Sequence, residues 1–241
     1  MLSPKDRLAF ALDVDTLDRA VAWVRLLAGE VGLFKVGLEL FASEGPAAIH
    51  ALRREGARIF LDLKLHDIPN TVGHAAMVAG RLGAELLTVH ASAGRAAIEA
   101  AVEGAAQGAR EVRLPAPGVL AVTVLTSLAD LDLQAIGLEG DSSSAALRLA
   151  KLAVAAGAQG CVCSPREVQL LRTELGPAPL LVVPGIRLAM GETHDQTRAD
   201  TPEAAIRGGA SVLVVGRPIR EAADPVAKAR EIVLEMGAGP R

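Results

Sequence analysis

The chain has 241 residues, enough for one large domain or two small ones, and 51% of them are hydrophobic, so a sizeable core is available. A formal net charge of -3, with no basic runs and no tyrosine, argues against binding to nucleic acid or to an anionic membrane surface. The chain has no signal-like apolar N-terminus, no disulfide framework and no apolar run near the ~20 residues of a membrane span, which predicts a cytoplasmic protein.

Short apolar runs alternate along the chain with longer segments rich in Ala, Leu, Glu and Arg. In the longer segments apolar residues recur at three- and four-residue spacing, which predicts helices. Strands are predicted at 7–13, 33–37, 58–64, 85–90, 118–125, 160–164, 179–184 and 211–216. Helices are predicted near 17–28, 44–55, 71–82, 94–107, 142–156, 165–175, 202–208 and 225–236, with a further short helix at 130–135. Pro165 and Pro225 suit first-turn positions, and Asp224 is a predicted N-cap.

This strict alternation of eight strands and eight helices predicts a parallel sheet. Eight such units in a chain of this length have the size of a (β/α)8 TIM barrel, which we expect to form a single domain over residues 1–241. A doubly wound sheet with extra units is the main alternative. The segment near 187–196 has polar and small residues without a strand pattern, and we expect a mobile loop there that closes over a phosphate.

The stretch from Phe60 to Thr71 is the most informative part of the chain and reads FLDLKLHDIPNT. Asp62 and Lys64 lie two residues apart in an apolar strand, so their side chains point to the same side. Lys35 also interrupts an apolar strand, although the chain has only five lysines among its 25 basic residues. Buried charges are costly unless they pair or take part in chemistry, so we expect these groups to be functional. A structural ion pair is the alternative.

Polar residues follow most of the predicted strands at their carboxyl ends, where active sites lie in barrels of this kind. They are Asp13, Lys35, Asp62, Lys64, His90, Thr126, Ser127, Arg187 and Arg217. Gly185 and Gly216 allow backbone N–H groups to approach an anion, and the arginine that follows each can bind it bidentately. The loops after strands seven and eight are the usual phosphate position, so we predict a phosphate site there, with Gln196 as a further ligand.

Together these residues resemble the orotidine 5'-phosphate decarboxylase family, and the resemblance spans essentially the whole chain. The segment 62–71 is its most specific element, because it matches the family's signature. The other matching elements, in the family's order and spacing, are Asp13, Lys35, Leu125-Thr126-Ser127, Pro184-Gly185-Ile186-Arg187, Gln196 and Gly216-Arg217. One departure is Ala93-Gly94, where the family pattern has two adjacent glycines.

The resemblance implies decarboxylation of orotidine 5'-phosphate to uridine 5'-phosphate, the last step of pyrimidine nucleotide synthesis, without a metal or an organic cofactor. It implies a homodimer in which Lys35, Asp62 and Lys64 form an alternating charge array with the partner's Asp67. Lys64 would donate a proton to carbon 6 of the pyrimidine. The implied substrate-binding residues are Asp13 (ribose), Thr126 and Ser127 (pyrimidine), Arg187, Gln196, Gly216 and Arg217 (phosphate), together with Lys35, Asp62, Lys64, Asp67, Ile68, Asn70, Thr71 and Pro184.

Three alternatives remain at this stage. Lys64 acting as a Schiff-base nucleophile is disfavoured, because two carboxylates nearby favour the charged ammonium. A metal-dependent sugar-phosphate decarboxylase or aldolase on the same barrel would be expected to carry a carboxylate where Lys35 stands. A non-catalytic nucleotide-binding protein is the third alternative, although nothing in the catalytic set is missing. His90 is a further possible ligand contact, whereas His66 is expected to shape the turn after its strand.

Overall fold

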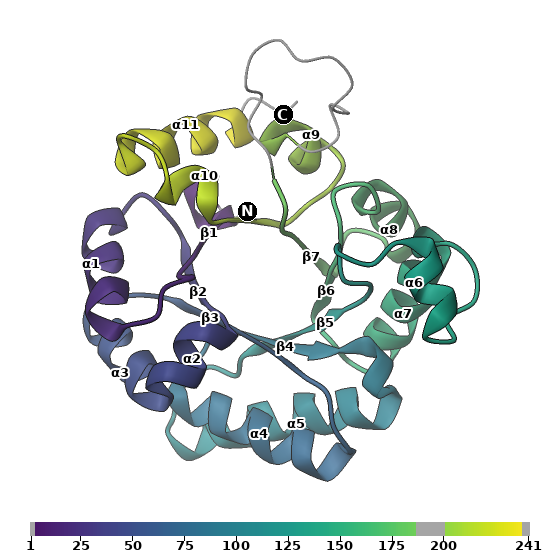
Figure 1. Cartoon of the computed structure of the whole chain (residues 1–241). Helices are drawn as coiled ribbons and strands as arrows, with labels where there is room; N and C mark the ends of the chain where they lie inside the picture. The colour runs from purple at the N-terminus through teal and green to yellow at the C-terminus, as the bar shows by residue number, and fades with distance from the viewer. Residues whose placement is uncertain (1–2, 187–200, 238–241) are drawn as a thin grey trace.

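The computed structural model describes residues 3–186 and 201–237 of the chain. Within these residues eight parallel strands form a closed barrel in the order β1 to β8, and β8 pairs with β1 (Figure 1). The predicted (β/α)8 TIM barrel is therefore confirmed, and the doubly wound alternative is wrong because the sheet closes on itself. Each described strand overlaps a predicted one.

The strands are β1 (Leu8–Ala11), β2 (Leu33–Val36), β3 (Ile59–Leu65), β4 (Leu86–His90), β5 (Gly118–Val122), β6 (Gly160–Val162), β7 (Leu180–Val183) and β8 (Val212–Val215). The α-helices are α1 (Leu17–Leu27), α2 (Leu38–Glu44), α3 (Pro46–Arg54), α4 (Pro69–Leu82), α5 (Arg95–Glu111), α6 (Asp130–Ala135), α7 (Ser142–Ala155), α8 (Val168–Leu175), α9 (Pro202–Arg207), α10 (Arg217–Arg220) and α11 (Pro225–Gly237). Two short 3-10 helices are η1 (Lys5–Arg7) and η2 (Ala91–Ala93). No helix in the described ranges is long and apolar enough to cross a membrane.

The helix boundaries differ from the prediction at a few places. The predicted first-turn position of Pro165 is wrong, because Ser164 and Glu167 close a turn first and α8 begins only at Val168. In this turn the Glu167 carboxylate accepts a hydrogen bond from the Ser164 N–H at 2.8 Å. The prediction for Pro225 is confirmed, since Pro225 begins α11 and the Asp224 carboxylate accepts a hydrogen bond from the Ala227 N–H at 3.0 Å.

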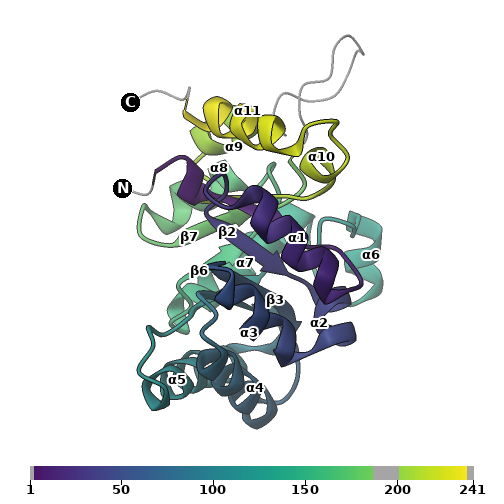
Figure 2. The same ribbon diagram turned by 90° about the vertical axis from the view of Figure 1, so that its left-hand side faces the viewer.

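Two further helices, α2 and α10, were not predicted. Both are short and begin directly after a glycine at the carboxyl end of a strand, Gly37 for α2 and Gly216 for α10. Neither is long enough to show a full apolar stripe, so periodicity gives no signal for them. Seen from the side, α2, α6 and α10 lie at the same end of the barrel (Figure 2). These short helices therefore surround the carboxyl ends of the strands.

The core has two layers that follow from the alternation of side chains along each strand. Residues facing the helices form the larger layer, which includes Phe10, Leu61, Val89, Cys161 and Cys163. Residues facing the barrel axis form the smaller layer. The interior residues are Ala9, Ala11, Leu33, Phe60, Leu86, Leu120, Val182, Val212 and Val214. The barrel is thus filled with apolar side chains below its carboxyl end.

Candidate active site

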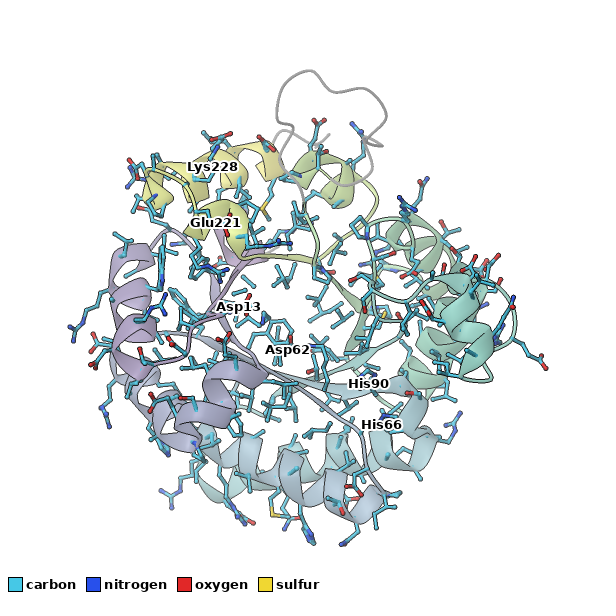
Figure 3. All side chains as sticks on the ribbon, viewed as in Figure 1. Asp13, Asp62, His66, His90, Glu221 and Lys228 are labelled. Carbon is cyan, nitrogen blue, oxygen red and sulfur yellow. The ribbon has the colours of Figure 1, made fainter. Side chains whose placement is uncertain are left out.

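The polar residues of the site continue the interior rows of the barrel at its carboxyl end. Asp13 lies two positions after the interior residue Ala11, and Lys35 lies two positions after Leu33. In the same way Asp62 follows Phe60 and Thr88 follows Leu86. Because strand residues two apart share a face, these four side chains point toward the barrel axis above its apolar filling. Figure 3 shows Asp13 and Asp62 near the centre of the barrel.

Four charged groups at this end of the barrel form a chain of alternating sign. The Lys35 Nζ lies 3.2 Å from Asp13 Oδ1 and 3.6 Å from Asp62 Oδ2. The Lys64 Nζ lies 2.7 Å from the same Asp62 oxygen. Asp62 is buried, with only 8% of the residue exposed, so its charge is compensated by two ammonium groups rather than by bulk water. The structure thus brings together the predicted residues Lys35, Asp62 and Lys64.

The backbone of β3 is irregular where it carries Lys64. Leu61 of β3 pairs with Leu87 of β4, but the next pair is Leu65 with Val89, so β3 has two extra residues in this interval. Lys64 has a φ of 51°, a left-handed conformation that is uncommon for a residue other than glycine. Bulges of this kind occur next to active sites, where they redirect a side chain. Here the irregularity accompanies the close approach of Lys64 to Asp62.

Asp67 lies apart from the charge cluster in the described chain. All six residues from His66 to Thr71 are exposed, including the apolar Ile68 at 65%. The Asp67 carboxylate accepts a hydrogen bond from the N–H of the next residue, Ile68, at 2.6 Å. Among the described residues no ion pair involves Asp67. The predicted site residues Asp67, Ile68, Asn70 and Thr71 therefore share one exposed segment between β3 and the first turn of α4.

His66 and His90 lie beside the charge cluster. Their ring centroids are 5.3 Å apart, with an angle of 38° between the ring planes. Burial lowers the pKa of His90, and the positive charges of His66 and Lys64 lower it further, whereas Asp62 acts in the opposite direction. Figure 3 places both histidines to one side of the barrel axis, away from Asp13. At neutral pH His90 is therefore held in its neutral form.

The β5 to β8 side of the barrel mouth holds an open cavity of about 1300 Å³. Of the predicted site residues, Thr126 and Arg217 line it, as does Gly185. Its lining does not include Lys35, Asp62 or Lys64, so the cavity adjoins the charge cluster rather than containing it. A ligand that reaches from Arg217 to Lys64 would occupy both regions.

Gly216 joins the two regions of the site. A Cβ atom at this position would lie 3.4 Å from Asp13 Oδ2 and 3.2 Å from the Ala11 Cβ, so a side chain here would press on the end of β1. Ser127 is exposed, and Pro184 is half-buried at the end of β7. Arg187 and Gln196, and the predicted loop near 187–196, lie outside the described residues.

A model of the family described as "Orotidine 5'-phosphate decarboxylase / HUMPS family" matches residues 6–232 of the chain. The chain belongs to this family. A protein from Anaeromyxobacter sp. (strain K), named orotidine 5'-phosphate decarboxylase, is 55% identical over 96% of this chain and 98% of its own length. A protein of the same name from Trichlorobacter lovleyi is 45% identical over 98% of this chain and 97% of its own length.

Two solved structures are similar to this chain over nearly its whole length. The crystal structure of orotidine 5'-phosphate decarboxylase from Lactobacillus acidophilus superposes with a TM-score of 0.85 at 38% identity, and the match covers 96% of this chain and 99% of that one. An uncharacterised conserved protein from Geobacillus kaustophilus gives a TM-score of 0.83 at 34% identity, over 95% and 99% of the two chains. The family that the sequence motifs resemble is thereby confirmed.

The departure from the family pattern at Ala93-Gly94 is accommodated locally. Ala93 ends the 3-10 helix η2, and it is not among the non-glycine residues with positive φ. Gly94, which follows, has a φ of 89°, in the left-handed region that favours glycine. Position 93 therefore does not require glycine in this chain.

Two residues of the site were missed by the sequence reasoning. Thr88 donates a hydrogen bond from its hydroxyl to Asp62 Oδ1 at 2.9 Å. Arg220 of α10 donates a hydrogen bond to the backbone oxygen of Asp13 at 3.0 Å. For Thr88 a signal was available, since it shares the interior face of β4 with Leu86. For Arg220 there was none, because α10 itself was not predicted.

Proposed function

We propose that this chain decarboxylates orotidine 5'-phosphate to uridine 5'-phosphate in pyrimidine nucleotide biosynthesis, without a metal or an organic cofactor. The observation that carries the proposal is the alternating cluster of Asp13, Lys35, Asp62 and Lys64 at the carboxyl end of the barrel. The names of the relatives at 45–55% identity support it. The cluster supplies what the reaction needs, namely a fixed cation and a proton source beside a carbon that becomes negative.

In the proposed reaction the bond between pyrimidine carbon 6 and the carboxylate carbon breaks. The electron pair of this bond stays on carbon 6, and the carboxylate leaves as carbon dioxide. The Lys64 ammonium stabilises the developing negative charge and then transfers one proton to carbon 6, which leaves Lys64 as a neutral amine. Solvent returns a proton to Lys64 after product release. The 2.7 Å contact with Asp62 holds the Lys64 ammonium in place for this transfer.

Electrostatic preorganisation is the main source of rate acceleration in this proposal. Lys35 and Lys64 each contact the Asp62 carboxylate, so these groups hold one another in place and need little reorganisation in the transition state. Asp62 would lie close to the departing carboxylate. The repulsion between these like charges would disfavour the bound substrate relative to the transition state.

The remaining predicted residues would bind the rest of the nucleotide. Asp13, whose side chain is 45% exposed, would accept hydrogen bonds from the ribose hydroxyls. Thr126 and Ser127 would contact the pyrimidine edge. Pro184, Gly216 and Arg217 would surround the phosphate from the ends of β7 and β8, together with Arg187, Gln196 and a closing loop near 187–196. Because the phosphate lies far from carbon 6, its binding energy would serve to orient the substrate.

A homodimer would complete this site. The segment of Asp67, Ile68, Asn70 and Thr71 is exposed in the single chain, and Asp67 finds no cation among the described residues. Large apolar side chains are also exposed on segments that follow the carboxyl ends of β2, β3 and β5. They are Leu38, Ile68, Leu131 and Ile136. An apolar surface around a barrel mouth favours burial against a second copy, which would bring the partner's Asp67 to Lys64.

A metal-dependent sugar-phosphate enzyme is the second candidate function, because the family description includes HUMPS proteins. Lys35 argues against it. The Lys35 ammonium lies between Asp13 and Asp62, where it occupies the place that a divalent cation would take and would repel such an ion. The curated relatives at 45–55% identity also carry the decarboxylase name.

The ultraviolet absorbance of orotidine 5'-phosphate in excess EDTA, followed with the wild type and with Lys64→Ala, tests the proposal. We expect conversion to uridine 5'-phosphate by the wild type and a loss of most activity in the variant. If a well-folded wild type is inactive in EDTA, and activity toward a sugar phosphate follows addition of magnesium, the second candidate function is correct. Tight binding of uridine 5'-phosphate without any turnover would instead indicate a nucleotide-binding protein.

A further inference from the structure

Thr88 lies in β4, opposite the irregular part of β3. The register of the two strands pairs Leu61 with Leu87 and then Leu65 with Val89. Thr88 alone therefore stands opposite the three residues from Asp62 to Lys64. A strand pair with extra residues on one side leaves backbone groups of the bulged strand without their regular partner. These backbone groups belong to the part of β3 that carries the predicted catalytic residues Asp62 and Lys64.

The Thr88 hydroxyl makes hydrogen bonds with the irregular part of β3. It accepts a hydrogen bond from the Lys64 backbone N–H at 2.9 Å. It also donates a hydrogen bond to Asp62 Oδ1 at 2.9 Å. Thr88 is fully buried, so no water replaces these partners. One hydroxyl thus satisfies both the left-handed backbone of Lys64 and one carboxylate oxygen of Asp62.

The other carboxylate oxygen of Asp62, Oδ2, contacts both lysines of the charge cluster. Asp62 Oδ2 faces the Lys64 ammonium at 2.7 Å and the Lys35 ammonium at 3.6 Å. With Oδ1 bound to Thr88, the carboxylate plane is fixed and Oδ2 can point only toward the two lysines. The left-handed φ of 51° at Lys64 is unfavourable for a residue other than glycine, and it persists where surrounding contacts determine it. The hydrogen bond from the Lys64 N–H to Thr88 is such a contact.

We propose that Thr88 is a positioning residue, whose hydroxyl sets the orientation of the Asp62 carboxylate and the backbone conformation of Lys64. The expected effect on kcat rests on the proposed function, whereas the positioning of Asp62 and Lys64 by Thr88 does not. Threonine suits the position because its β-branch is compatible with a strand, while its hydroxyl both donates and accepts. Valine has the same shape but leaves a buried N–H and a buried carboxylate oxygen without this partner.

The test compares Thr88→Val with Thr88→Ser. In Thr88→Val we expect kcat for orotidine 5'-phosphate to fall by roughly 10- to 100-fold, with KM changed far less, because small displacements of catalytic groups affect the chemical step most strongly. Thr88→Ser keeps the hydroxyl and should recover most of kcat. A crystal structure of Thr88→Val should show Asp62 rotated away from Lys64, or Lys64 outside the left-handed region.

Thr123→Val is the matched control. Thr123 is also buried, and its hydroxyl donates a hydrogen bond to the backbone oxygen of Val162 at 3.0 Å. It directly follows β5, and alternation places it on the same side as Val119 and Ala121, which pack against the helices. Its hydrogen-bond partner Val162 does not belong to the charge cluster. Thr123→Val removes a comparable hydrogen bond, so it should lower the melting temperature without the selective loss of kcat.

The proposal is overturned if Thr88→Val keeps the wild-type kcat and the wild-type contact between Asp62 and Lys64, or if Thr88→Ser loses as much kcat as Thr88→Val. A wild type that is inactive in EDTA would refute the proposed function, and the crystal structure of Thr88→Val would still decide the positioning role. If Thr88→Val does not fold, Thr88→Cys replaces it. A thiol is a weak donor and a weak acceptor, so Thr88→Cys must then fall well below Thr88→Ser in kcat.

Discussion

The Lys35 ammonium of β2 lies 3.2 Å from the carboxylate of Asp13, which follows β1, although the two residues are separated by 22 positions. Only 12% of the Lys35 side chain is exposed, and its Nζ also faces the buried Asp62. Lys35 thus separates two carboxylates that would otherwise repel each other at the mouth of the barrel. Its role in stability follows from this position between two negative charges.

Lys35→Met should therefore destabilise the fold. The side chain keeps an unbranched apolar stem, but Asp13 and Asp62 lose the cation between them. Loss of one partner of a buried pair costs about 3–5 kcal/mol, and because Asp62 keeps Lys64 and Asp13 is partly exposed we expect about 1–3 kcal/mol here. Denaturant unfolding of both proteins measures this difference in the free energy of unfolding.

Lys151→Met is the control for Lys35→Met. Lys151 lies 2.6 Å from Glu174, and both side chains are exposed to solvent. Exposed ion pairs contribute about 0–1 kcal/mol, so this variant should remain close to the wild type. Equal losses of stability in the two variants would contradict the structural importance of the Lys35 position.

Mixing two inactive variants tests whether Asp67 is shared between subunits. In a dimer of Lys64→Ala with Asp67→Asn, one site would contain the intact Lys64 of one chain and the intact Asp67 of the other. If half of the dimers are mixed after subunit exchange, one of the two sites in each mixed dimer is intact, and roughly a quarter of the wild-type activity should return. The measurement is the rate of orotidine 5'-phosphate consumption before and after exchange.

The double variant Lys64→Ala/Asp67→Asn provides the matching control. Its mixed dimers with the wild type would contain no intact site, so exchange should lower the activity of the wild-type chains. If Asp67 acts within its own chain, the wild-type chains keep their activity after exchange with the double variant, and the mixture of Lys64→Ala with Asp67→Asn gains none. That result, after confirmed exchange, would end the shared-site proposal.

The fold could be predicted from the sequence because each unit carries strong local signals. An apolar run of strand length followed by an amphipathic segment recurs eight times, and every described strand overlaps its prediction. The failures are local and have local causes. The turn between Ser164 and Glu167 delays α8 past Pro165, and α10 has only four residues, too few to show periodicity.

The site could be predicted only in part, because motifs give residue types but not their contacts. Alternation along a strand placed Asp62 and Lys64 on one side, and the two side chains do meet. The bulge in β3 and the left-handed Lys64 could not be predicted, since they depend on pairing with β4. The same holds for Thr88, whose partners belong to another strand. Asp13 was predicted to bind ribose, but its contact with Lys35 was not predicted and is seen only in the structure.

His90 should make the stability of the protein depend on pH. Its pKa is lowered in the folded state, first by burial and then by His66 and Lys64, so the unfolded chain binds a proton more readily. Stability is therefore fully present above the unfolded pKa of about 6.5 and is lost as pH falls toward the lower folded pKa. Glutamine does not titrate in this range. The free energy of unfolding of His90→Gln should therefore fall less than that of the wild type between about pH 7 and pH 5.

His66→Gln separates the causes of this effect. The variant removes the neighbouring positive charge but leaves the burial of His90, which is the larger cause. The loss of unfolding free energy on acidification should therefore become smaller in His66→Gln without disappearing. Denaturant unfolding at a series of pH values measures it, and parallel curves for the wild type and His90→Gln would show that His90 is not responsible.

The contact between α4 and α5 should be intolerant of any side chain at Gly104. A Cβ atom there would lie 2.1 Å from the backbone oxygen of Gly73 on the facing helix, too close for any packing. Gly104→Ala gains about 1 kcal/mol of helix propensity, but overpacking of this kind costs about 1–3 kcal/mol or more, and here the obstacle is backbone that cannot rotate away. We therefore expect a net loss of stability, measured as a lower denaturant midpoint.

Glu103→Ala is the control for Gly104→Ala, because Glu103 is the preceding residue of α5 and points to solvent. It changes a neighbouring position to the same residue type without entering the contact with α4, so it should leave the midpoint nearly unchanged. Since α4 begins directly after the segment of Asp67 and Ile68, a helix displaced by the added methyl group would also move that segment. Gly104→Ala should therefore lose activity in the proposed dimer as well as stability, whereas a midpoint equal to that of Glu103→Ala would show that the two helices can separate without cost.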